Sequence, residues 1–398
     1  MPYFTSVTRK HALSSNLRLN QLPKELPAAS SWGAKEMFAF RVVVQATNAR
    51  ILPRLEKGSH HALASSNKAL LELVKPAPPN LPIHAETDLA IRYGPTLGQF
   101  WAALTNVMAG GPEQDPEQDP EQDSLGMEDG LAGYVSEGER KIGGEDIASS
   151  PEQPPSKRAR KTAEHPNMVT STKVQFGSSS PCQPSSQVSP EDDAFVPLND
   201  GLDAALEIET ERLVTCFLRH ILYSVPYEEL ELQNRLECRT RLSVRVYTEG
   251  RWCIQAEDDG GLRVRYPTSQ NGEPTYHLPQ LRDCYHVLFE AKRRFRHICE
   301  GRPTISDAWL GQMTAEALVG RLVRKREYAD PSIFIIAAAR QYIRFLQFDI
   351  SEEYLSDVEK EDAQLTLPVT GTGWLDLSDP MDRKAAVVNV LGLVDLIE

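Results

Sequence analysis

The stretch Y-H-V-L-F-E-A-K-R-R-F, from Tyr285 to Phe295, is the part of the sequence that decides the fold. Its residue pattern predicts a β-strand, in which successive side chains point to opposite faces. One face carries Val287, Phe289 and Ala291, and the other carries His286, Leu288, Glu290 and Lys292. A carboxylate and an ammonium group therefore project together from one side of an otherwise apolar strand.

Charged side chains are rarely buried without a partner, so Glu290 and Lys292 need an explanation. One explanation is chemical: Glu290 ligates a divalent cation, and Lys292 points at the same water or phosphate. The other is structural: the strand ends here and emerges into solvent. A tripeptide of this kind matches by chance often, so the flanking sequence has to decide between the two.

The charge of the chain is unevenly distributed. The formal net charge is −13, which by itself argues against nucleic acid as a partner. Much of the excess acid, however, lies in residues 112–152 and after Glu352, and residues 201–350 are close to balance. A local basic run follows the predicted strand, at Lys292, Arg293, Arg294 and Arg296. Net charge therefore does not exclude a locally basic groove.

The cysteines and the N-terminus bear on the compartment. Six cysteines are widely spaced without a C-x-x-C motif, which is typical of free thiols in a reducing compartment. Cys284 and His286, with His297 and Cys299, could be drawn as a zinc site, but their spacing fits no common zinc finger. The first residues lack the apolar segment of a signal peptide, and no apolar run approaches the roughly 20 residues of a membrane span. We expect a soluble intracellular protein.

The first 108 residues predict a flexible N-terminus and a small globular unit. Residues 1–30 are polar and irregular. In residues 31–108 the composition becomes that of a globular α+β unit. Phe38–Gln45 has the pattern of a strand, while Ala62–Val74 and Leu97–Met108 have helical apolar spacing.

Residues 109–197 predict a disordered, acidic linker. Pro112–Asp123 contains three copies of P-E-Q-D, and the Ser, Pro and Glu bias continues to the end of the segment. Such sequence buries too little apolar surface to offset chain entropy. Within it, four cations lie close together: Lys157, Arg158, Arg160 and Lys161. This cluster indicates a nuclear-import signal read by an acidic receptor, although a solvated charge cluster or a phosphate-binding patch has the same composition.

Residues 200–398 predict a second globular region that combines helices and strands. Helices are expected at Glu207–Tyr223 and Asp307–Arg326, and a last one at 379–397, capped by Asp379 before Pro380. Strands are expected at Leu242–Thr248, Trp252–Ala256, Leu262–Tyr266, Ile333–Ala338 and Tyr342–Phe348. The acidic, Gly-containing segment from Glu257 to Gly261 is expected to separate two of them.

This order of elements resembles the PD-(D/E)XK nuclease superfamily, and specifically the nuclease-like proteins found in fungi. The resemblance covers about residues 205–350, and its points of match are Asp258-Asp259, Glu290-Ala291-Lys292, and Gln312 with Glu316-Ala317-Leu318. It implies an α/β (α+β) fold with a restriction-endonuclease-like core, a mixed β-sheet flanked by helices. The sequence lacks the Pro-Asp pair of the family, so either aspartate can be the ligand.

The resemblance implies a metal-dependent nuclease acting in the nucleus. A magnesium ion held by Glu290 and by Asp258 or Asp259 would activate water for phosphodiester hydrolysis. Lys292 would orient that water or stabilise the transition state, and Gln312 would brace the site. The three arginines at 293, 294 and 296 would contact the nucleic-acid backbone. Glu209 or Glu211 could join the metal shell, but surface charge is the simpler reading of both.

Two other functions compete with this one. The domain can be a catalytically silent module that binds nucleic acid or protein in the nucleus, because a fold does not imply its activity. A sugar- or nucleotide-active enzyme is the third candidate. The sequence holds no Gly-rich phosphate loop, no G-x-S-x-G and no H-E-x-x-H motif to support it.

Overall fold

The computed structural model describes part of the chain. The described residues are 17–45, 49–58, 62–81, 84–109, 194–195, 200–226, 234–249, 252–270, 273–276, 280, 283, 285–292, 295, 297–299, 302–324, 330–360 and 363–396. The basic cluster at 157–161 and nearly all of the expected linker lie outside them, as do Arg293, Arg294 and Arg296.

Within the described residues, eight strands form one mixed sheet in the order β1-β12-β11-β10-β7-β4-β3, with β13 paired to β11. The strands are β1 (Val42–Gln45), β3 (Arg235–Tyr247), β4 (Cys253–Arg265), β7 (Val287–Lys292), β10 (Ser332–Ala339), β11 (Tyr342–Asp349), β12 (Leu367–Gly371) and β13 (Leu375–Asp376). β7 runs parallel to β10, and β1 runs parallel to β12. The central strand β10, S-I-F-I-I-A-A-A, is buried at every position, as its continuous apolar run requires.

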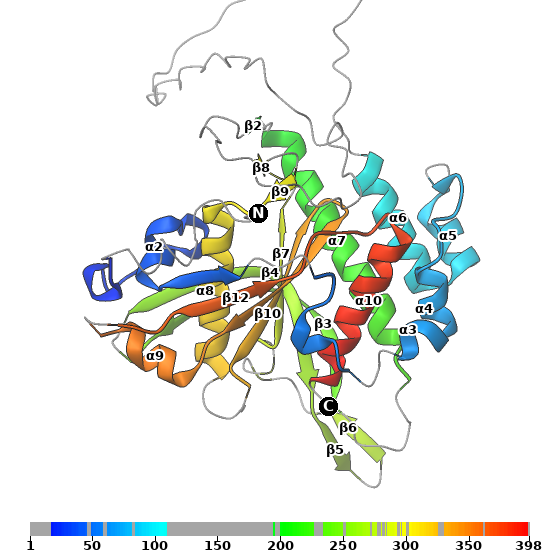
Figure 1. Ribbon diagram of the computed structural model, residues 1–398. Helices are drawn as coiled ribbons and strands as arrows, with labels where there is room; N and C mark the ends of the chain where they lie inside the picture. The colour runs from blue at the N-terminus through cyan, green and yellow to red at the C-terminus, as the bar shows by residue number, and fades with distance from the viewer. Residues whose placement is uncertain are drawn as a thin grey trace, which may run out of the picture. The chain divides into compact units, whose positions relative to one another are not determined.

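Helices cover both faces of this sheet (Figure 1). One face is covered by α8 (Asp307–Arg324), with α2 (Ala34–Ala39) and α9 (Glu352–Val358) near it. On the other side lie α3 (Leu63–Ser66), α4 (Lys68–Leu73), α5 (Glu86–Tyr93), α6 (Pro95–Ala109), α7 (Asp200–Ser224) and α10 (Pro380–Asp395). The observed architecture therefore confirms the expected mixed sheet flanked by helices.

Short elements complete the described chain. They are the 3-10 helices η1 (Leu19–Gln21), η2 (Ala29–Ser31) and η3 (Pro53–Leu55), the strand pair β5 (Pro267–Gln270) and β6 (Glu273–Tyr276), and a small sheet of β2 (Ala194–Phe195), β8 (His297–Cys299) and β9 (Arg302–Thr304). In the part of the chain that the structure describes, no helix combines the length and the apolar character needed to span a membrane.

The two faces of β7 belong to two hydrophobic cores. Val287 and Phe289 pack in the core that contains Phe217 of α7. Leu288 packs in the core that contains Leu310 of α8. The period-two reading of this strand is confirmed, and both of its faces are buried.

The N-terminal residues belong to the same compact unit as the C-terminal region. β1 is an edge strand of the main sheet, and Phe100 of α6 packs against Phe217 of α7 with ring centroids 5.8 Å apart. The buried Arg383 side chain of α10 donates hydrogen bonds to the carbonyl oxygens of Leu73 (2.9 Å) and Leu377 (2.7 Å). Residues 31–108, expected to form a unit of their own, thus share a sheet and a core with the rest.

The structure also corrects the expected break between Trp252–Ala256 and Leu262–Tyr266. These segments form one strand, β4, because the residues between them also pair with β3. Positions 257, 258, 260 and 261 are paired, and position 259 is not. Gly260 has a φ of +154° and Gly261 lies against the backbone of β7, so the glycines here permit a bend within a strand rather than a loop.

The C-terminal helix is confirmed in its position and its cap. Asp379 precedes α10, and its side chain accepts hydrogen bonds from the backbone N–H groups of Met381 (2.8 Å) and Asp382 (2.9 Å). The apolar residues Val387, Val390 and Leu391 are buried in the core shared with α7.

A first prediction concerns the approach of β7 to β4. A Cβ atom at Gly261 would collide with the backbone carbonyl oxygen of Val287, so Gly261→Ala must push the two strands apart. We expect the free energy of unfolding to fall by about 2 kcal/mol or more. Gly33→Ala is the control, because nothing lies within 4 Å of its added Cβ. Urea unfolding of both variants measures the effect, and equal midpoints would contradict the close approach.

A second prediction concerns the N-terminal residues. Residues 200–398 expressed alone would expose the core side chains of α7 that α6 covers, among them Phe217. We therefore expect this fragment to aggregate or to lose cooperative unfolding, and to become soluble when coexpressed with residues 17–111. The control is the full chain with residues 112–167 replaced by a short Gly-Ser linker, which should unfold cooperatively. A monomeric, cooperatively unfolding fragment would contradict the shared core.

Candidate active site

The candidate site lies where β4 and β7 separate. The two strands are paired at Gly260–Phe289, Gly261–Leu288 and Leu262–Val287, and the pairing stops there. The next position on β4 is Asp259, and the next on β7 is Glu290. Both acidic residues therefore stand at the point where the sheet opens.

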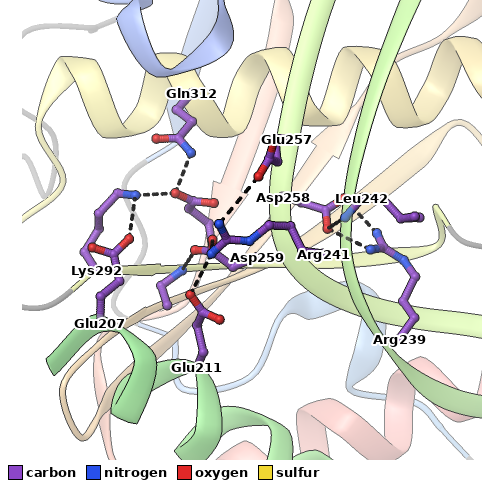
Figure 2. Close-up of polar contacts among 12 residues, drawn as sticks. Glu207, Glu211, Arg239, Arg241, Leu242, Glu257, Asp258, Asp259, Lys292 and Gln312 are labelled. Atoms are coloured by element: carbon purple, nitrogen blue, oxygen red, sulfur yellow. Dashed lines mark hydrogen bonds and ion pairs between the residues drawn. The ribbon is translucent and has the colours of Figure 1, made fainter. Parts of the chain in front are cut away.

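Asp259 reaches across this opening to β7 (Figure 2). Its Oδ2 accepts a hydrogen bond from the backbone N–H of Ala291 at 2.9 Å. Its Oδ1 accepts one from Nη2 of Arg241 on β3, also at 2.9 Å. The side chain is only 10% exposed, so these contacts fix the carboxylate next to the strand that carries Glu290.

Asp258 serves a different purpose. Its carboxylate is buried and accepts two hydrogen bonds from the guanidinium of Arg239, at 2.7 and 2.9 Å, with a third from the N–H of Leu242 at 3.3 Å. Burial raises the pKa of Asp258, and the Arg239 contacts act against that rise. The structure thus distinguishes the two aspartates, with Asp258 locked in an ion pair and Asp259 held against β7.

Glu290 is fully buried and is contacted from two directions. Its Oε1 accepts hydrogen bonds from Nε2 of Gln312 on α8, at 2.5 Å, and from Nζ of Lys292. Oε2 is also buried, and no side chain of the described residues donates a hydrogen bond to it. Lys292 is 22% exposed and lies 3.7 Å from Oε1 of Glu207 on α7. Glu290, Lys292 and Gln312 therefore converge, as the sequence predicted, and Glu290 does not emerge into solvent.

Glu316 is the residue that the sequence analysis missed as a member of the site. It lies one turn after Gln312 on α8, which places both side chains on one face of the helix. Both of its carboxyl oxygens are buried without a hydrogen-bond donor among the described residues. Burial and the neighbouring Glu290 raise its pKa well above the ordinary value. Burial likewise raises the pKa of Glu290 to about 8, against the opposing effect of the Lys292 ammonium.

The acidic residues of α7 are divided between the site and its surroundings. Glu211 is bridged to Asp259 by Arg241, whose Nη2 lies 2.9 Å from a carboxylate oxygen of each. Glu209 accepts a hydrogen bond from Asn106 of α6 at 3.2 Å instead. Glu207, which approaches Lys292, was not anticipated, although its place one turn before Glu211 puts the two on one helix face.

Two observations bear on whether this site could hold a metal ion. Among the described residues, no group of three or more His, Cys, Asp and Glu side chains is arranged to hold a metal ion. The donor chemistry nevertheless suits a hard cation, because the buried carboxyl groups of Glu290 and Glu316 interact and the Lys292 ammonium lies beside Glu290. Magnesium is commonly held by one or two carboxylates with waters and substrate phosphates. A magnesium site on Glu290 and Asp259 therefore stays a prediction of the sequence.

Comparison with known proteins adds no assignment. No protein-family model matches the chain, and no curated protein matches its sequence.

A third prediction follows from the raised pKa values. A carboxyl group whose pKa is higher in the folded protein stabilises the fold below its ordinary value of 4.5, and this contribution is lost as the pH rises through about 8. Without metal, the free energy of unfolding should therefore fall from pH 6 to pH 9. The fall is up to about 1.4 kcal/mol per pH unit for each proton that the protein releases on unfolding.

Glu316→Gln removes one of the two carboxyl groups, so the fall should become much smaller. The control is Glu353→Gln, a substitution at a fully exposed carboxylate on α9, which should leave the pH dependence as it is. Urea unfolding in EDTA at four pH values measures the free energy for each protein. An unchanged slope in Glu316→Gln would contradict the raised pKa of the Glu316 carboxyl group.

Proposed function

We propose that this protein is a metal-dependent nuclease with a restriction-endonuclease-like core, which hydrolyses phosphodiester bonds of nucleic acid. The observation that carries the proposal is the convergence of Asp259, Glu290 and Lys292 at the point where β4 and β7 separate. Strongly perturbed carboxyl groups beside a specific charge partner are common at catalytic sites. The order of the elements and their motifs supports the same reading.

Glu290 and Asp259 would hold the metal ion. Among the described residues no donor reaches Oε2 of Glu290, and each oxygen of Asp259 keeps a lone pair beyond the hydrogen bond given above. A bound magnesium ion supplies a water of lowered pKa and polarises the phosphate. Gln312 holds Oε1 of Glu290 from α8 and so fixes the orientation of the carboxylate.

Lys292 acts as a cation and not as a base. Burial lowers the pKa of its ammonium, but the Glu290 and Glu207 carboxylates raise this pKa by a larger amount. The pKa of Lys292 therefore lies above its ordinary value. The group therefore stays protonated at neutral pH and donates to Glu290. At 22% exposure it also remains accessible to a phosphate oxygen, whose developing negative charge it can stabilise during hydrolysis.

A second candidate is a catalytically silent module of the same fold that binds nucleic acid or protein. The observation that favours it is the closed contact of Lys292 and Gln312 on Oε1 of Glu290, because such a contact also satisfies a merely structural carboxylate. For either candidate we propose nuclear localisation, supported by the basic residues Lys157, Arg158, Arg160 and Lys161 alone.

A fourth prediction tests the proposed roles in the full chain. Glu290→Gln should abolish binding of manganese or magnesium and with it cleavage. Lys292→Ala should retain metal binding but lower the cleavage rate by about 100-fold or more, because it removes only the cation that faces the phosphate. Isothermal calorimetry with manganese and a gel assay on mixed DNA and RNA measure the two quantities separately.

The control for both variants is Glu353→Gln, a substitution at a fully exposed carboxylate on α9. It should bind metal and cleave as the wild type does. Wild-type protein that binds no metal and cleaves neither DNA nor RNA would contradict the nuclease and leave the silent module.

A further inference from the structure

A cleft of about 500 Å³ lies beside the candidate site. One stripe of α7, from Ile208 to Arg219, forms one wall, and residues 239–241 of β3 line it as well. Glu86 of α5 and Gln99 of α6 close it from the N-terminal helices. Asp259 and Phe289 also line it, so the cleft borders the point where β4 and β7 separate.

The arginines that line this cleft differ in whether they form ion pairs. Arg241 is paired with Asp259 and Glu211, and Arg212 is paired with Glu86 across the cleft. Arg219, by contrast, is exposed and makes no ion pair with any described residue. It lies two turns beyond Glu211, or about 12 Å along the helix axis. A positive charge without an ion pair among the described residues therefore lies at one end of the cleft, and the acidic site lies at the other.

The cleft also offers apolar surface. Ile208 is 61% exposed and lines it near the N-terminal end of the stripe. A ligand that carries both negative charge and apolar rings matches this combination. Nucleotides have this composition, because each joins a phosphate to a flat base.

We infer that this cleft binds one strand of a polynucleotide, whose backbone follows α7 from Arg219 toward Asp259. The inference deepens the proposed nuclease function and rests on it for the direction of the strand. A single strand is favoured over a duplex because residues of α5 and α6 as well as of β3 line the cleft, and a volume of about 500 Å³ holds only a few nucleotides. Grooves of this kind hold single strands through cations that track the backbone.

Binding to the full chain in EDTA tests the inference without catalysis. The probes are a fluorescein-labelled oligothymidine of 20 nucleotides and a labelled duplex of the same length, measured by fluorescence anisotropy at several salt concentrations. Arg219→Gln should weaken single-strand binding roughly three- to ten-fold and make the slope of log K against log salt shallower by about 0.7, as expected for one lost phosphate contact. The duplex should bind the wild type at least about ten-fold more weakly than the single strand.

The matched control is Arg245→Gln, an exposed arginine of β3 that does not line the cleft. It should bind as the wild type does, and thermal unfolding of both variants should be unchanged. Unaltered binding by Arg219→Gln, an equal loss in Arg245→Gln, equal affinity for the duplex, or no binding by the wild type would each overturn the inference. Wild-type protein that binds through Arg219 but cleaves nothing would support the cleft and contradict only the nuclease.

Discussion

The separation of β4 from β7 is the constraint on which the candidate site depends. Gly260 and Gly261 let β7 approach closely, since a Cβ at either position would collide with Phe289 or with the carbonyl oxygen of Val287. One position later the ladder ends, and the Asp259 side chain accepts the hydrogen bond of the Ala291 N–H that a strand carbonyl would otherwise take. The same carboxylate thus satisfies the opened backbone and lies beside Glu290.

The buried carboxyl groups of Glu290 and Glu316 destabilise the fold locally, and the rest of the fold must offset this. Glu290 and Glu316 are both inaccessible, and Lys292 forms an ion pair with Glu290. Replacing a buried charge by an apolar residue of similar size is often neutral or stabilising, so packing alone gives no reason for this pair. Helix α8, which carries Glu316, is held by Leu310, Met313 and Leu318 in the hydrophobic core that also contains Leu288. This packing keeps Glu316 next to Glu290. A group of this kind is explained more simply by function than by stability.

Much of this arrangement could be predicted from local sequence. The alternation around Glu290, the apolar spacing of α8 and the cap of α10 are properties of a few consecutive residues. β4 was misread as two strands because charge and glycine interrupt its alternation, while its continuity comes from the paired strand β3. The choice between Asp258 and Asp259 likewise depends on register, which places Arg239 against the first and Ala291 against the second. Glu316 was within reach, because its spacing of four from Gln312 defines one helix face.

The N-terminal residues could not be placed from sequence, and they change how the site is built. The pairing of β1 with β12 joins segments more than three hundred residues apart, for which no local pattern exists. The N-terminal helices also bear on the cleft. Helix α6 packs on the apolar face of α7, and another stripe of α7 lines the cleft together with β3. The ion pair between Glu86 and Arg212 then ties α5 to that stripe. Glu86 and Gln99 thus line the cleft together with residues of α7, β3 and β7. A reading limited to residues 205–350 therefore omits a part of the chain that shapes access to the site.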